Sequence, residues 1–285
     1  MSAGVGYALL SLLSAGILDV VFGRYSSTRP LSGTYLVATG MVVVVGQLIA
    51  LYAARVPFIL DPTAALWGIA AGVIVLVANA LLIESLARLA VSLGSTIYRL
   101  NTIAVVAFAV VFLDETLTAL KIAGVLLGVL GVVLLYRRGA RSGDDRLLLA
   151  GVGIAVAASL LRAVFGIVSK VGLSDGTDPF VLMVYIGVGW TLAGIAYGAI
   201  RHGRSVALAA VLPYAAVSGA LICLVASFLM LGLRVGEASV VIPIANMSFI
   251  VALLGAAGMG MERITTRKLL AVGCAALAII LLTRA

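Results

Sequence analysis

Three ionisable residues, Asp19, Arg99 and Arg162, stand within long apolar stretches of this sequence. A charge inside a membrane is energetically expensive, so such residues usually face a protein interior or a water-filled cavity and take part in function. A guanidinium that has no acid partner is well suited to bind the carboxylate or phosphate group of a ligand. These three residues are therefore the first candidates for a binding site.

The depths of the three charges follow from the helical rise of about 1.5 Å per residue. We name A the side of the membrane at which the chain starts and B the opposite side. Asp19 then lies roughly 6 Å, and Arg99 about 5 Å, from the midplane toward B. Arg162 lies at a similar distance toward A, roughly 10 Å from Asp19 along the axis. No acid of the second half shares this depth, since Glu237 stands at the A end of its span. The sequence predicts an Asp19–Arg99 pair and an Arg162 without an acid partner.

Each of these charges also has a structural interpretation. The Asp19–Arg99 pair is either a fixed brace or a group that handles substrate or protons. Arg162 either binds substrate or extends its side chain to the A surface. A largely apolar pocket needs a few polar contacts, and the remaining candidate site residues are Asn79, Tyr98, Asn101, Trp190 and Asn246. For Trp190, packing is the simpler interpretation.

The composition indicates what holds these residues in place. Of the 285 residues, 64% are hydrophobic and 11% are charged, which is far more apolar than a soluble domain of this size. Apolar runs of about 20 residues match the thickness of a bilayer, and helices satisfy their own backbone groups in lipid. The net charge of +8 is spread over short connections, so no basic arm for nucleic acid is expected. We predict an all-α integral membrane protein.

Ten transmembrane helices can be drawn along the sequence. The first five spans are Val5–Tyr25, Tyr35–Ala54, Ala65–Arg88, Val91–Leu113 and Thr118–Tyr136. The second five are Leu147–Lys170, Phe180–Ile200, Ala207–Leu233, Glu237–Gly260 and Thr265–Leu282. A polar linker at 139–146 divides the chain into a first half, 1–138, and a second half, 147–285.

The two halves repeat each other. Residues 115–137 align without a gap with residues 262–284, and both copies begin with Glu and end with Arg. The first spans of the halves carry Asp19-Val-Val-Phe-Gly and Arg162-Ala-Val-Phe-Gly. Because each half has an odd number of spans, equivalent helices run in opposite directions. Two inverted five-helix repeats are common among secondary transporters, whose site lies near the midplane at the repeat interface.

The repeated segment also predicts how its helices pack. Gly124 and Gly128 of the first copy align with Ala271 and Ala275 of the second. This spacing of small residues lets apolar helices approach closely in lipid. We expect these faces to mediate close helix packing, within one chain or in a homo-oligomer.

The turns before the repeated helices have a structural interpretation as well. Thr118 and Thr265 are expected as helix N-caps, and Glu115 and Glu262 are expected to cap or brace these turns. Glu84 and Arg88, which stand four residues apart on one span, are most simply a surface pair. These residues are therefore assigned to the scaffold rather than to the site.

Two five-span halves, each with a Glu-x-x-Thr turn before a Gly/Ala-rich last helix, resemble the drug/metabolite transporter (DMT) superfamily, EamA type. The resemblance covers essentially the whole chain, and the turns at Glu115 and Glu262 are its most specific part. Family members commonly have a proline in the fourth span, where this chain has Arg99-Leu100-Asn101-Thr102; the second half keeps Pro243. The resemblance implies transport of a small solute.

The leading expectation is a secondary transporter that moves a small polar metabolite, an amino-acid-like zwitterion or an organic anion, by alternating access as an exporter or exchanger. The sequence contains no G-x-x-x-x-G-K-[ST] motif for ATP coupling. A proton is a candidate coupling ion through Asp19, although Arg99 would hold Asp19 ionised. A lipid or lipid-linked headgroup flippase is the alternative. A membrane-embedded transferase is a weaker one, because no cluster of acids, His or metal ligands is visible.

We expect no enzyme activity, cofactor or metal. Cys223 and Cys274 stand singly in apolar runs and are interpreted as packing residues. The expected location is the cell membrane, plasma or inner, with the chain crossing it several times and its substrate and the lipid bilayer as partners.

The orientation follows from the distribution of basic residues. The B-side connections carry Arg24, Arg29, Arg88, Arg137, Arg138, Arg141, Arg146, Arg201, Arg204, Arg263, Arg267 and Lys268. The A side carries Arg55, Lys121, Lys170, Arg234 and Arg284. Since cytoplasmic loops are rich in Lys and Arg, we predict B in the cytoplasm and both termini outside.

Overall fold

The computed structural model of the chain describes residues 2–26, 33–58, 60–86, 97–135, 145–200, 207–258 and 265–285. Within these ranges the regular elements are all helices. The first half contains α1 (Ala3–Ser26), α2 (Gly33–Ala53), α3 (Pro62–Leu86), α5 (Asn101–Leu113) and α6 (Ala119–Leu135). The second half contains α7 (Asp145–Ser174), α8 (Pro179–Ile200), α9 (Leu208–Val235), α10 (Ala238–Ala245), the short 3-10 helix η1 (Asn246–Ser248), α11 (Phe249–Gly258) and α12 (Thr266–Leu282).

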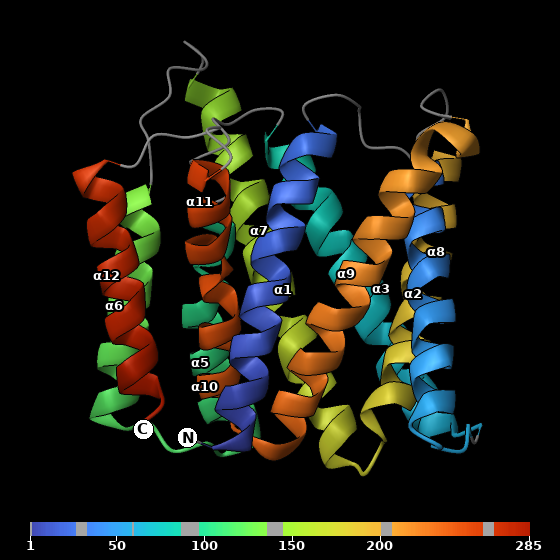
Figure 1. The fold of residues 1–285 in the computed structure, drawn as a ribbon, viewed down its shortest axis with the longest axis horizontal. Coiled ribbons are helices and arrows are strands. Elements are labelled where there is room, and N and C mark those ends of the chain that lie inside the picture. Colours follow the sequence, from blue (N-terminus) through green and yellow to red (C-terminus); the bar gives the residue numbers. More distant parts are fainter. Residues whose placement is uncertain are drawn as a thin grey trace.

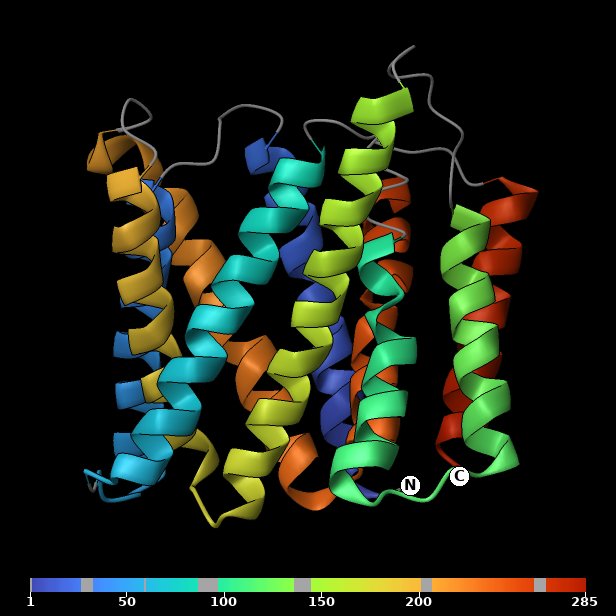
Figure 2. The same cartoon turned by 180° about the vertical axis from the view of Figure 1, so that it is seen from behind.

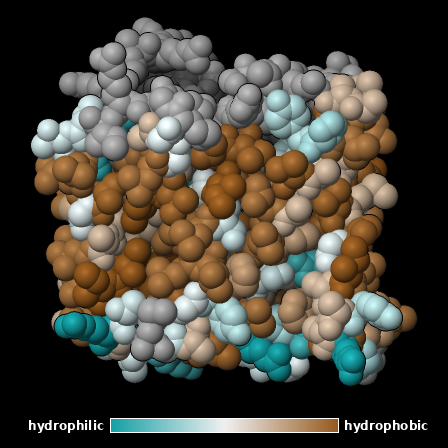
Figure 3. All heavy atoms as spheres, viewed as in Figure 1, coloured by the Kyte–Doolittle hydropathy of each residue, from teal (hydrophilic) through white to brown (hydrophobic). Residues whose placement is uncertain are grey.

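Most of these helices are long and apolar enough to cross a bilayer. Seven candidate spans lie in the described ranges, and they comprise α1, α2, α3, α7, α8, α9 and the segment from α10 into α11. α5 and α6 are shorter apolar helices. Hydrophobic residues form a broad belt across the middle of the face in Figure 3, and hydrophilic residues gather below it. The chain is a multi-pass membrane protein, as its composition predicts.

The fourth and ninth predicted spans are not continuous helices. In the fourth, Leu100 forms a turn and α5 begins only at Asn101. In the ninth, α10 is followed by η1, where Met247 has φ −82° and ψ 16°, outside the helical range. Pro243 lies in α10 shortly before this break, and proline removes an N–H from the helical ladder. Each of these two spans is thus an apolar helical segment with a local break.

The helices of the two halves interleave. α1 packs on α9 and α3 packs on α7, while α2 lies against α8 and α6 against α12. The ribbon runs upward in α1 and α6 but downward in α7 and α12, and both chain ends lie on the same side (Figure 1). Seen from behind, the α6–α12 pair again stands at one edge of the bundle (Figure 2). α7 begins at Asp145, within the predicted linker 139–146.

The predicted small-residue faces of α6 and α12 do pack together. A Cβ atom added at Gly124 would lie 2.7 Å from Leu282 Cγ and 3.3 Å from the Ala278 carbonyl oxygen. One added at Gly131 would lie 3.0 Å from the Ala271 carbonyl oxygen. The two helices are therefore too close for larger side chains on this face, and the packing prediction is confirmed within the chain.

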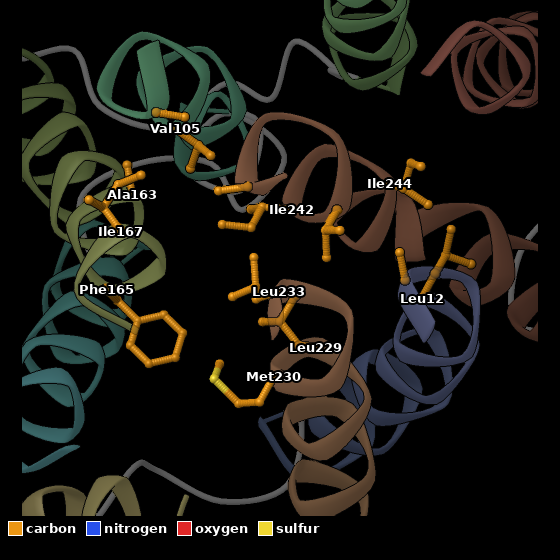
Figure 4. Packing of buried hydrophobic residues seen from close by; sticks show 14 of the residues in the cluster. Leu12, Val105, Ala163, Phe165, Ile167, Leu229, Met230, Leu233, Ile242 and Ile244 are labelled. Carbon is orange, nitrogen blue, oxygen red and sulfur yellow. The ribbon is translucent and has the colours of Figure 1, made fainter. Parts of the chain in front are cut away.

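The main hydrophobic core lies where α1, α5, α7, α9 and α10 face one another (Figure 4). Val105 of α5, Ile167 of α7, Leu233 of α9 and Ile242 of α10 point into the same region, and each is at most 7% exposed. Side chains from both halves thus close the middle of the bundle with apolar surface.

Candidate functional site

Asp19 and Arg99 form the ion pair that their predicted depths indicate. Arg99 Nη2 donates a hydrogen bond to Asp19 Oδ2 at 2.8 Å. The Arg99 and Asp19 side chains are 25% and 33% exposed, so the pair is partly shielded. α1 positions Asp19 near its last turns, and the turn at Leu100 positions Arg99 immediately before α5. The prediction of this pair is confirmed.

Arg99 also connects the pair to the other half of the chain. Its Nη1 donates to the Asn246 carbonyl oxygen at 3.1 Å and to Ser248 Oγ at 3.2 Å. Ser248 in turn donates to Asp19 Oδ2 at 3.1 Å. The guanidinium carbon lies 5.8 Å from the centre of the Phe249 ring, a cation–π distance. Arg99 is therefore held by a carboxylate, a carbonyl, a hydroxyl and an aromatic face.

The two helix breaks meet through a small amide network. Asn246 Nδ2 donates to Asn101 Oδ1 at 2.7 Å and to Thr102 Oγ1 at 3.1 Å. Asn101 and Thr102 are 2% and 6% exposed. The gap-free alignment of residues 115–137 with residues 262–284 can be continued toward the N-terminus, and it then pairs Leu100 with Met247. In this alignment the turn at Leu100 falls on the non-helical Met247, and the two breaks are joined by the hydrogen bonds of Asn246.

Tyr98 and Asn79 form a second polar contact beside this cluster. Tyr98 donates from its hydroxyl to Asn79 Oδ1 at 3.0 Å, which links the start of the broken segment to α3. Tyr98 lies within electrostatic reach of Asp19, Arg99 and Arg162. The hydrogen bonds and the ion pair thus bring together six of the eight predicted site residues: Asp19, Asn79, Tyr98, Arg99, Asn101 and Asn246.

Arg162 differs from Arg99 in its contacts. It is partly buried on α7, and its guanidinium carbon lies 5.0 Å from the centre of the Phe165 ring. Among the described residues no acid forms an ion pair with it, whereas Arg99 has Asp19. The prediction that the second half lacks a matching acid is in agreement with these contacts.

Trp190 is the predicted site residue that the structure assigns to the scaffold. Its indole Nε1 donates to the Leu36 carbonyl oxygen of α2 at 3.1 Å, and its ring lies close to Gly40. This contact fixes α8 against α2, in line with the packing interpretation. Arg88, the predicted partner of Glu84, lies outside the described residues.

A second polar cluster lies at the A end. Glu115 accepts hydrogen bonds from the backbone N–H groups of Ala238 at 2.6 Å and Ser239 at 2.9 Å, and from the Ser239 hydroxyl. It therefore caps the N-terminus of α10, in the opposite half, and does not merely brace its own turn. Lys121, expected on the A side, is only 1% exposed and pairs with Glu237. Lys121 therefore lies at the A end, as predicted, but it is buried there.

The predicted threonine caps are confirmed. Thr118 Oγ1 accepts from the Lys121 N–H at 3.2 Å, and Thr265 Oγ1 accepts from the Lys268 N–H at 3.4 Å. Glu262 lies outside the described residues.

Sequence reasoning missed Ser248, Thr102, Phe249 and Phe165 as neighbours of the buried charges. Small hydroxyl and aromatic residues are frequent in apolar spans, so the residue type alone does not indicate that these four residues lie near a charge. The register of the repeat was the available signal for Ser248, because it aligns with Asn101. Within the described residues, no group of three or more His, Cys, Asp or Glu could hold a metal ion.

Comparison with known proteins agrees with this architecture. Residues 2–137 match the EamA-like transporter family. One solved crystal structure of a protein is similar to this one. The similarity covers 100% of this chain and 99% of the other chain, with a TM-score of 0.79 and 19% sequence identity. At this identity the likeness concerns the fold. No curated protein matches the sequence.

Proposed function

We propose, on the premise that the chain is an EamA-like member of the DMT superfamily, that it is a secondary transporter for a small anionic or zwitterionic metabolite. It would work by alternating access, with the two halves rocking against each other around a central site. The observation that carries the proposal is the meeting of two broken helices, one from each half, where Asn246 binds Asn101 and Thr102. Arg162, a partly buried guanidinium with no acid partner in the described part of the chain, lies within electrostatic reach of Tyr98 at the start of the first of these segments.

The packing supports an inverted repeat of five helices in each half. In this repeat α1, α2, α3 and α6 correspond to α7, α8, α9 and α12. The contact between α1 and α9 is then equivalent to the contact between α7 and α3, and the α2–α8 and α6–α12 contacts each join a helix to its own counterpart. Helices at equivalent positions, such as α1 and α7, run in opposite directions (Figure 1). Rocking of one repeat against the other is the usual motion of transporters built in this way.

The broken helices support a site at the interface of the halves. Discontinuous helices at membrane depth leave backbone groups available, and they are tolerated where they are buried in protein or line a cavity. Here Arg99 already binds the Asn246 carbonyl oxygen. The amide of Asn246 and the hydroxyl of Tyr98 add neutral polar groups around the same point.

Arg162 supports the choice of substrate charge. The repeat places it where the first half has Asp19, so the second half carries a cation in place of an acid. A substrate carboxylate or phosphate would supply the missing negative charge and could bind the guanidinium in a bidentate manner. Asp19 is already engaged with Arg99 and Ser248. We therefore favour exchange of solutes over proton transfer through Asp19.

The experiment is a thermal-stability screen of the purified protein against amino acids, organophosphates, nucleobases and organic cations. A ligand at a hundred times its Kd should stabilise the protein by about 2.7 kcal/mol. The compounds that stabilise it should be anionic or zwitterionic, and proteoliposomes should take them up in exchange for the same compound inside. Stabilisation by cations alone would contradict the proposal. Movement of fluorescent lipid without uptake of any solute would favour a flippase.

A further inference from the structure

We propose that the A end of the protein is closed by a gate that consists of an ionic layer at the surface and an apolar layer beneath it. The ionic layer comprises Glu115, Lys121, Lys170 and Glu237, and the apolar layer comprises Val105, Leu233 and Ile242. The proposal rests on the proposed function, because only a protein that alternates between two open states needs such a gate. It assigns the described conformation to the state that is closed toward A.

The ionic layer joins the two halves at the turn between α9 and α10. Lys121 of α6 pairs with Glu237 and also donates to the Thr116 carbonyl oxygen at 2.6 Å. Glu115 caps α10 immediately after that turn. Lys170 of α7 donates to the carbonyl oxygens of Leu233 at 2.6 Å and Gly236 at 2.8 Å.

The charges of this layer balance, with two lysines and two glutamates. Glu115 and Glu237 both lie within electrostatic reach of Lys170. The first half contributes Glu115 and Lys121, and the second half contributes Lys170 and Glu237. Separation of the halves at this end must therefore break the Lys121–Glu237 pair and the cap on α10 together.

The apolar layer lies between this cluster and the candidate site. Ile242 is one helical turn from Asn246 in one direction and a little more than one turn from Glu237 in the other. Val105 of the first half and Leu233 of the second are 0% exposed and point toward the same region as Ile242 (Figure 4). Side chains from both halves thus separate the central charges from the A surface.

The Lys121–Glu237 pair, with one side chain buried and the other half-exposed, suits a contact that opens rather than a permanent brace. A buried ion pair contributes little net stability compared with packed apolar side chains. Lys121 is 1% exposed here, but Glu237 is 46% exposed and already touches the aqueous edge. Both groups can therefore be hydrated when the halves separate at this end, whereas an apolar contact would resist separation.

The residues of the ionic layer are only partly repeated at the other end of the protein. In the register of the repeat, Glu115 aligns with Glu262, Lys121 with Lys268 and Ser239 with Ser92, but Glu237 aligns with Ala90. The acid of the ion pair has no counterpart in the first half. At the aligned positions the repeat supplies the lysine but not the acid, so the two ends of the protein differ in sequence at this contact.

The test measures how fast a cysteine beneath the ionic layer of the gate reacts with a water-soluble maleimide. The background carries Cys223→Ala and Cys274→Ala, and the reporter is Ala109→Cys, at a position that is 0% exposed. Residue 109 lies one turn nearer to A than Val105 on the same face of α5. Glu237→Gln should speed labelling at least about tenfold, because it leaves Lys121 buried without its partner. Unchanged labelling in a folded Glu237→Gln protein overturns the gate.

Two controls separate the gate from a general loss of structure. Arg234→Gln removes an ion pair with Asp178 at the same end, but that pair lies within the second half, so labelling should stay slow. Lys121→Met combined with Glu237→Met restores a neutral contact, and labelling should return to the slow rate. Fast labelling in both controls would overturn the proposal, since the effect would then be nonspecific.

A second measurement covers the case in which Glu237→Gln does not fold. Lys121→Cys and Glu237→Cys are joined by a short, reducible thiol cross-linker. The cross-linked protein should lose transport of the substrate found in the stability screen, and reduction should restore it. Full transport in the cross-linked protein overturns the gate. If no solute is transported by any variant, the proposed function fails, while the labelling rates still report on the gate.

Discussion

The guanidinium of Arg99 contacts the carboxylate of Asp19 at 2.8 Å, and Arg99 also binds the Asn246 carbonyl oxygen of the opposite half at 3.1 Å. One side chain thus neutralises a partly buried acid of its own half and binds the broken helix of the other half. Arg99 makes two separate contacts, one with Asp19 and one with Asn246. A mutation of Asp19 removes the first contact and leaves the second in place.

Asp19→Asn should lower the free energy of unfolding by about 1.5–3 kcal/mol, the scale of a hydrogen bond between charged groups. The loss is no larger because the pair is only partly shielded and Arg99 keeps its contacts with Asn246 and Ser248. The double variant Asp19→Asn with Arg99→Gln should recover most of that loss. Melting curves of the single and double variants measure the effect. Full transport by the double variant would show that the pair is a brace and takes no part in substrate handling.

Arg162→Gln should weaken substrate binding by about 1.5–3 kcal/mol, the scale of a hydrogen bond to a charged group. The fold should be retained, because the variant removes a partly buried charge that no described acid neutralises. Isothermal titration with the substrate identified by the stability screen measures the loss. Unchanged affinity would contradict the anion-binding assignment and leave Arg162 as a residue that packs on Phe165.

Glu115→Ala should destabilise the protein by about 2–4 kcal/mol, because two buried N–H groups at the start of α10 lose their acceptor. Thr265→Ala, at the N-cap of α12, is the matched control and should cost only about 1 kcal/mol. Denaturation in a mild detergent compares the two. An equal loss in both variants would mean that Glu115 contributes no more than an ordinary cap.

Gly124→Leu should separate α6 from α12 and lower the melting temperature, since even a Cβ atom at this position comes within 2.7 Å of Leu282 Cγ. Gly273→Leu provides the control on the partner helix, because a Cβ atom there meets nothing within 4 Å. The first variant should be clearly less stable than the second. Equal melting temperatures would be inconsistent with close packing of these faces.

The orientation of the chain can be measured with two cysteines in the background without Cys223 and Cys274. Ser142→Cys stands in a B-side connection of the sequence, and Leu60→Cys stands on the A side, where Leu60 is 80% exposed. In intact cells, an impermeant thiol reagent should label Leu60→Cys and spare Ser142→Cys, since the positive charge predicts B inside. The opposite pattern would place A in the cytoplasm.

The class of the protein and the depths of its buried charges follow from the amino-acid sequence alone. Apolar runs long enough to span a bilayer can form little else than helices, and a charge placed within such a run has a depth that follows from counting residues. Matching depths and opposite signs are therefore enough to pair Asp19 with Arg99. The threonine caps and the small faces of α6 and α12 follow from local spacing in the same way.

The contacts between the halves, in contrast, depend on how the helices pack in three dimensions. The sequence places Lys121 on the A side in the first turn of a helix, but the packing of α6 near the start of α10 is what buries it against Glu237. Glu115 reaches the opposite half for the same reason. Helix periodicity specifies which face of each helix is apolar, but it does not specify which partner covers that face. Long-range pairs such as Arg99 with Asn246 depend on that choice of partner.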